Sequence, residues 1–169
     1  MTEVEKFELK PIHRESVGHS LDKARKYRLL NDPLQAESIC LDILAIEPDH
    51  EAARIELILA MSDQFAGARK SPSKAEILTH VDKLADDYSR LYYRGLVCER
   101  EALAFLERDH AAAFAYDGLR DAMDLYEQAE SIRPAGNEDA VLRWNACVRA
   151  IQREKLKPPV RYRRELPLE

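Results

Sequence analysis

The chain has 169 residues, of which 46% are apolar and 34% charged, so it can bury a core of ordinary domain size. This balance excludes a disordered, collagen-like or low-complexity chain, and the lack of long apolar runs argues against a membrane-spanning helix. The net charge of −5 argues against a general binder of nucleic-acid backbones, although residues 153–164 carry six basic side chains and one acidic one.

The three cysteines, Cys40, Cys98 and Cys147, are far apart in sequence and form no C-x-x-C motif. A sparse, odd set of thiols suits a reducing compartment, where each thiol packs as a small apolar side chain. The first residues are acidic and have no apolar segment behind them, which argues against a secretory signal. We therefore expect a cytoplasmic protein.

The first half of the chain alternates helical patterns with sharp stops. Residues 1–15 form a mixed lead-in, and from Ser16 the apolar residues follow helical spacing up to a turn at residues 31–33. Proline at residue 33 suits the first turn of a second helix, which either Asn31 or Asp32 can cap. A third helix, from about Glu51, is apolar nearly all round and should be covered on more than one side.

The clearest loop spans residues 66–72, and Ser73 with Glu76 then forms an S-x-x-E capping box that starts a helix. The apolar residues after it recur at alternating spacings of four and three as far as Phe105. This pattern allows one long helix over residues 74–108. Two helices with a break at residues 86–89 are favoured, because Asp and Ser are good caps and poor interior residues.

A further helix is expected from residue 111 or 112 to Arg133, and it should bury either Phe114 or Ala115. After a stop at residues 134–136, Asn137 is expected to cap a last helix, and Pro158 opens an irregular basic tail. No period-two apolar pattern indicates a strand. The sequence therefore predicts an all-α fold of about six to seven helices.

Small residues and prolines recur at matching places in two parts of the chain. In the first part, Ala24 and Tyr27 lie on one predicted helix, Ala36 lies on the next, and Pro48 follows it. The alanines allow the two helices to approach closely, and the proline stops the second helix. This unit resembles a tetratricopeptide repeat, a helical hairpin of about 34 residues.

A second match lies nearer the C-terminus, with Gly95 on one predicted helix, Ala122 on the next, and Pro134 after it. Gly95 and Ala122 are about fifteen residues further apart than in a standard repeat. Either both helices are longer by about two turns, or a kink or loop near residues 109–110 takes up the excess.

The resemblance implies stacked antiparallel helical hairpins, an α-solenoid with a right-handed superhelix. It implies a single domain over residues 16–155, between the lead-in and a tail at residues 156–169. The repeat-like units would span residues 17–50, 51–86 and 88–136, with a last helix at residues 138–155.

Such repeats usually bind peptide or protein segments in a concave groove lined by the first helix of each hairpin, so the resemblance implies a non-catalytic interaction module. The side chains facing the groove would be Arg25, Arg28, Tyr92, Leu96, Arg100, Asn145 and Arg149, with Leu21, Glu99 and Gln152 among them. Leu21 and Arg25 stand where family members that grip a C-terminal carboxylate have lysine and asparagine, so that clamp is not implied. The arginines favour a protein or peptide partner with acidic groups, and a homodimer stays open.

Motifs for catalysis or metal binding are weak. Residues 47–50 and 107–110 have the pattern E-x-x-H, which helps to hold metal ions in helical bundles. Pro48 ends the helix within the first copy, so its glutamate and histidine cannot lie on one helix face. The second copy lies among charges near a helix end. The five histidines (13, 19, 50, 80 and 110) are expected at the surface or at junctions, and the cysteines within the packing. We expect no catalytic residue, metal site, cofactor, nucleic acid or membrane span; the alternative is a small helical-bundle enzyme or metal-binding protein.

Overall fold

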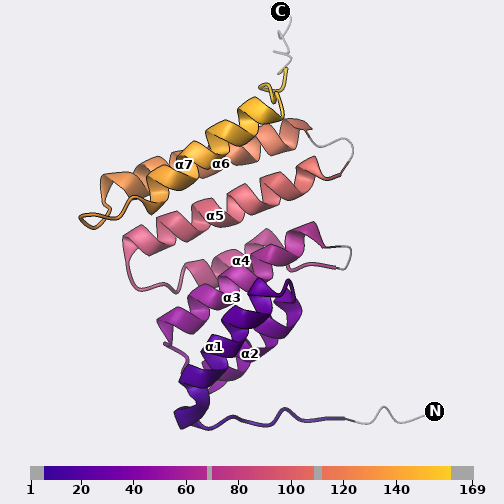
Figure 1. The fold of residues 1–169 in the computed structure, drawn as a ribbon, viewed down its shortest axis with the longest axis vertical. Coiled ribbons are helices and arrows are strands. Elements are labelled where there is room, and N and C mark those ends of the chain that lie inside the picture. Colours follow the sequence, from indigo (N-terminus) through magenta and orange to yellow (C-terminus); the bar gives the residue numbers. More distant parts are fainter. Residues whose placement is uncertain (1–5, 68–69, 109–111, 161–169) are drawn as a thin grey trace, which may run out of the picture. The chain divides into compact units, whose positions relative to one another are not determined.

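The computed structural model in Figure 1 describes residues 6–67, 70–108 and 112–160. Every regular element in these ranges is a helix, with seven α-helices and two short 3-10 helices, so the predicted all-α class is confirmed there. None of the described helices is both long and apolar enough to cross a membrane. The chain divides into two compact units, Met1–Pro72 and Ser73–Glu169.

The first unit is built from three α-helices. Its elements are η1 (Arg14–Ser16), α1 (Val17–Leu29), α2 (Pro33–Ile46), α3 (Glu51–Asp63) and η2 (Gln64–Ala66). α1 packs against α2, α2 packs against α3, and α1 also contacts α3. Val17, Leu21, Ile43 and Ala53 form a buried cluster among these helices. α3 buries charged as well as apolar side chains, which confirms that it is covered on more than one side.

The turn between α1 and α2 uses both residues that were expected as alternative caps. Asn31 has φ 59°, and two N–H groups close the end of α1: Asp32 donates to Tyr27 O and Asn31 to Arg28 O, both at 2.9 Å. This is the left-handed C-terminal cap that asparagine tolerates. The carboxylate of Asp32 then accepts from Gln35 N–H at 3.3 Å, so Asp32 is the cap of α2.

The second unit contains α4 (Lys74–Val81), α5 (Asp87–Leu106), α6 (Ala112–Ser131) and α7 (Asp139–Arg153). α4 packs against α5, and α5, α6 and α7 run back and forth beside one another (Figure 1). Their shared core includes Leu119, Ala122, Tyr126 and Cys147, all fully buried.

Two helices, rather than one long helix, follow residue 73. Ser73 and Glu76 form both bonds of the expected capping box at the start of α4. α4 ends at Val81, and Asp86 caps α5 by accepting from Ser89 N–H at 2.8 Å. That backbone hydrogen bond lowers the pKa of Asp86. Two helices are therefore confirmed, and the break between them lies at residues 82–86 rather than 86–89, because residues 87–89 already belong to α5.

The long separation of Gly95 and Ala122 comes from long helices, since α5 and α6 have 20 residues each. Residues 109–110, where a kink or loop was the alternative, lie outside the described residues.

On α6, Ala115 is buried while Phe114 is 68% exposed. The expected cap of α7 is one residue off: Glu138 is the cap, while Asn137 accepts from Asp139 N–H at 2.9 Å.

Replacing Ala36 with leucine is expected to lower the free energy of unfolding by about 2 kcal/mol. Ala36 is fully buried on α2, which packs against both α1 and α3, so three extra carbons must displace neighbouring groups. Urea unfolding followed by circular dichroism measures the change. Ala45, an exposed alanine on the same helix, gives the control Ala45→Leu. Equal midpoints for the two variants would show that Ala36 does not lie at a close helix crossing.

Candidate functional site

In the first unit, an arginine joins two helices that are not consecutive. Arg28 on α1 donates to Glu56 at 3.0 Å and to Asp63 at 2.8 Å, and both carboxylates belong to α3. The Arg28 side chain is 20% exposed and the Glu56 side chain 7%. Arg28 therefore holds α1 against α3 through two hydrogen bonds to carboxylates within the unit.

The second unit contains a similar connection, in which the carboxylate is more deeply buried and the arginine more exposed. Arg143 on α7 donates to Glu99 on α5 through Nε at 3.0 Å and through Nη2 at 2.5 Å. The hydroxyl of Tyr126 on α6 also donates to Glu99, at 2.6 Å. The Glu99 side chain is only 4% exposed, so one carboxylate ties three helices together inside the unit.

The two units thus share one packing pattern. Each unit contains one contact between alternate helices, α1 with α3 and α5 with α7, and in each case a charged pair joins the two helices. The packing residues of the sequence analysis fit this pattern: Ala24, Ala36 and Ala122 are fully buried, Tyr27 is half-buried, and Pro48 and Pro134 are exposed at helix ends. A Cβ on Gly95 would lie 2.8 Å from Cε1 of Tyr126. α5 therefore lies so close to that ring that only glycine, which has no Cβ, fits at residue 95.

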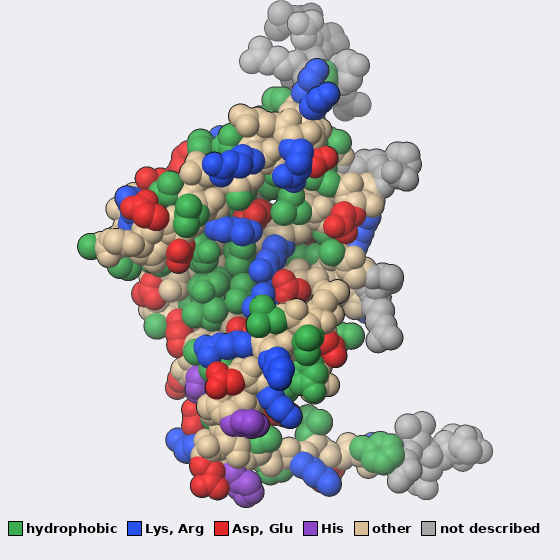
Figure 2. All heavy atoms as spheres, in the orientation of Figure 1, with side chains coloured by type: hydrophobic (Ala, Val, Ile, Leu, Met, Phe, Trp, Pro, Cys, Tyr) green, Lys and Arg blue, Asp and Glu red, His purple; other side chains and the backbone are tan. Residues whose placement is uncertain are grey.

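The side chains expected to face a groove differ widely in exposure. On α1, Arg25 is exposed and pairs with Asp22 at 3.2 Å, while Leu21 is buried. On α5, Leu96 and Glu99 are buried, Arg100 is partly exposed, and half-buried Tyr92 stacks on Tyr88. On α7, Asn145 is partly exposed, and Arg149 and Gln152 are exposed. Figure 2 shows several basic side chains over α7, interspersed with apolar and acidic ones.

The three thiols are poor candidates for nucleophiles. Cys40, Cys98 and Cys147 are all buried and unpaired with one another, as expected from their places on apolar stripes. Burial raises the pKa of all three, to about 12 for Cys40 and about 12 for Cys147. A raised pKa disfavours the thiolate form that nucleophilic chemistry needs.

The first E-x-x-H motif has a structural role. His50 is the cap of α3, and its Nδ1 accepts from Ala53 N–H at 3.1 Å. His110 of the second copy lies outside the described residues. Within the described ranges, no group of three or more His, Cys, Asp or Glu side chains has the geometry to hold a metal ion.

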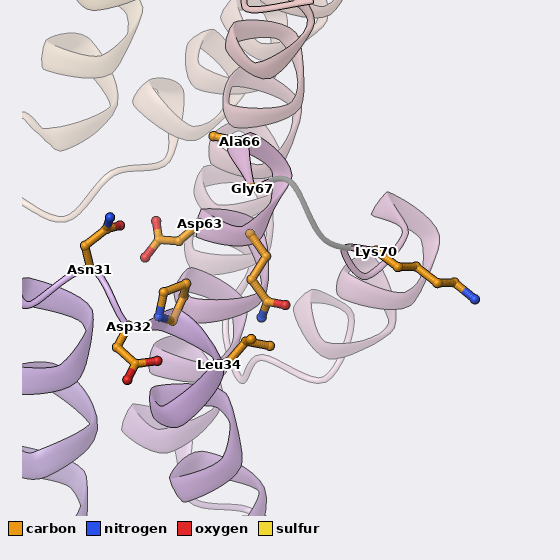
Figure 3. A pocket seen from close by; sticks show the side chains of 9 residues that line it. Asn31, Asp32, Leu34, Asp63, Ala66, Gly67 and Lys70 are labelled. Atoms are coloured by element: carbon orange, nitrogen blue, oxygen red, sulfur yellow. The ribbon is translucent and has the colours of Figure 1, made fainter.

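The first unit also contains a pocket of about 790 Å³ that the sequence did not predict. It lies between the α1–α2 turn and the segment after α3 (Figure 3). The lining residues are Asn31, Asp32, Pro33, Leu34, Asp63, Gln64, Ala66, Gly67 and Lys70. Most of them belong to segments that the sequence marked only as stops and loops, which gave no signal that the segments meet.

No family model matches this chain, and none of the curated proteins or solved structures compared with it matches either. The resemblance to tetratricopeptide repeats therefore stays a prediction.

Proposed function

We propose that this chain is a non-catalytic interaction module, built of tetratricopeptide-like helical hairpins, that binds a protein or peptide segment. The observation that carries the proposal is the contact between alternate helices in each unit, α1 with α3 and α5 with α7. Stacked hairpins place their first helices side by side in this way, and the surface so formed is the one that repeat proteins use for binding. Three buried thiols suit a reducing, cytoplasmic setting.

Each of the two units is proposed to have its own binding face. Arg28 and Arg143 are committed to internal carboxylates, so they shape the faces rather than contact a partner. Arg25 on α1 and Arg149 on α7 are exposed, and Arg149 forms no ion pair with a described residue. These two arginines are therefore the side chains through which acidic groups of a partner would be held.

A library of random displayed peptides tests this function. We expect the full chain to select peptides enriched in Asp and Glu, and Arg25→Gln or Arg149→Gln to weaken binding of those peptides at least tenfold. A charge-assisted hydrogen bond is worth about 1.5–3 kcal/mol, and tenfold corresponds to about 1.4 kcal/mol. Fluorescence anisotropy with labelled peptides measures the change.

Arg120 provides a matched control. It lies on α6, a second-type helix, and its exposure and its ion pair with Asp124 resemble those of Arg25 with Asp22. Arg120→Gln should leave peptide affinity unchanged. Failure to enrich any peptide, or an equal loss of affinity in Arg120→Gln, would count against the proposed faces.

A further inference from the structure

The second unit has a cleft where the chain leaves α7 and comes next to α6. Its volume is about 540 Å³. One wall belongs to the segment after α7 and the other to the first half of α6, and the lining residues are Tyr116, Asp117, Arg120, Asp121, Pro158 and Pro159. The segment after α7 therefore starts beside the solvent-facing side of α6, on which Arg120, Asp121 and Asp124 are exposed.

Leu156 and the two prolines set the course of this segment. The Leu156 side chain packs against the core of the unit, and its N–H donates to Ile151 O at 3.0 Å. Proline cannot continue a helix, and a residue that precedes a proline is biased toward extended conformations. Lys157 and Pro158 both precede a proline, so the chain leaves α7 in an extended form and reaches α6 at the cleft.

The α6 wall of the cleft carries two carboxylates without a partner. Asp117 and Asp121 form no ion pair or hydrogen bond with a described residue, and Asp117 is only partly exposed. Arg120, the cation of the lining, pairs with Asp124 at 3.4 Å. Residues 109–110, just before α6 and outside the described residues, are an aspartate and a histidine, so they add no permanent positive charge. The negative charge of this wall is therefore left uncompensated.

The residues that follow the cleft in sequence have the opposite charge. Val160 is the last described residue, and residues 161–165 read R-Y-R-R-E, with three arginines and one glutamate. Arg161 is only two residues beyond Pro159, which lines the cleft. A guanidinium group binds a carboxylate through two parallel hydrogen bonds, so arginine suits unpaired aspartates better than lysine does.

We propose that this face of α6 is a docking site for an extended basic segment, and that its occupant is the chain's own Arg161 and Arg163, bound to Asp117 and Asp121. Alternate residues of an extended chain point to the same side about 6.6 Å apart. Residues four apart on a helix lie on one face about 6 Å apart along the axis. The two spacings match, so both arginines reach a carboxylate at once.

The occupant comes from the same copy of the chain, because Pro158 and Pro159 already place the start of the segment at the cleft. The site does not depend on the proposed function, since the exposed arginines of α1 and α7 take no part in it. It takes a basic segment, whereas those arginines are proposed to hold an acidic one.

Limited digestion of the full chain with trypsin, followed by mass spectrometry, tests the docking, because a docked arginine is a poor protease site. We expect cleavage after Arg161 to be at least threefold slower in the full chain than in a peptide of residues 157–169, and the difference to shrink in high salt. Asp117→Asn and Asp121→Asn should each speed this cleavage at least twofold. Asp139→Asn is the control: Asp139 is exposed on α7 without an ion pair to a described residue, and the rate should stay unchanged.

Nuclear magnetic resonance of the full chain locates the docked arginines. Replacing Arg161 and Arg163 by glutamine is expected to shift the backbone amide signals of Asp117 and Asp121 at every protein concentration. Equal cleavage rates in chain and peptide, equal rates in the wild type and the two α6 variants, or shifts confined to residues 158–165 would overturn the site. Shifts on α6 that fade on dilution would overturn docking within one copy and indicate the segment of a second copy instead.

Discussion

Glu99→Gln is expected to lower the free energy of unfolding of the second unit by about 3 kcal/mol. The Glu99 carboxylate is almost fully buried and accepts from Tyr126 at 2.6 Å and from two nitrogens of Arg143. Its neutral replacement leaves the guanidinium of Arg143 partly buried without a counter-charge. Because the Arg143 side chain is 35% exposed, water compensates part of the loss, which places the effect at the low end for a broken buried pair.

Trp144 is the only tryptophan of the chain, and it lies on α7 against the core of this unit. Its fluorescence during urea unfolding therefore reports on the second unit. Glu130→Gln is the control, since Glu130 forms an exposed pair with Arg133 and should change stability by less than about 0.5 kcal/mol. Adding Arg143→Met to Glu99→Gln should recover part of the loss, because it removes the uncompensated charge. Equal stability of the two glutamine variants would contradict the burial of this network.

Gly95→Val is expected to destabilise the same unit by about 3 kcal/mol, even though valine favours helix more than glycine does. A Cβ at residue 95 would lie 2.8 Å from Cε1 and 3.0 Å from Cδ1 of Tyr126. The ring of Tyr126 is fully buried and its hydroxyl is bonded to Glu99, so it has no room to move away.

Gly18 gives a matched control for this substitution. It lies on α1, and a Cβ there would meet no atom within 4 Å, so Gly18→Val should cost no stability. Thermal unfolding followed by circular dichroism compares the two variants. A melting temperature of Gly95→Val within a degree of the wild type would show that α5 and α6 do not approach as closely as described.

Most of the helix boundaries that could be predicted depend on residues close together in the sequence. The capping box at Ser73 and Glu76 and the cap at Asp86 depend on residues three apart, so the sequence shows both partners at once. Small residues within apolar stripes leave room for a neighbouring helix, and in the structure a Cβ on Gly95 would lie 2.8 Å from Tyr126 while Ala122 is fully buried.

Contacts between helices were harder to predict. Arg28 and Arg143 meet carboxylates 28 to 44 residues away, and the spacing on one helix does not say which neighbour supplies the partner. For the same reason Glu99 was expected beside a groove and is instead buried. The pocket at Asn31 and Gln64 depends on the meeting of a turn and a helix end, which leaves no periodic signal.

Hydrogen–deuterium exchange of the full chain, with and without a selected acidic peptide, tests the proposed binding faces most directly. Peptide binding is expected to slow exchange in the first-type helices, at Arg25 on α1 or at Arg149 on α7, and to leave α2 and α6 unchanged. Bound segments shield the backbone and stabilise the helix they contact, so protection marks the face that is used. Protection confined to α2 or α6 would contradict the assignment of binding to the first-type helices.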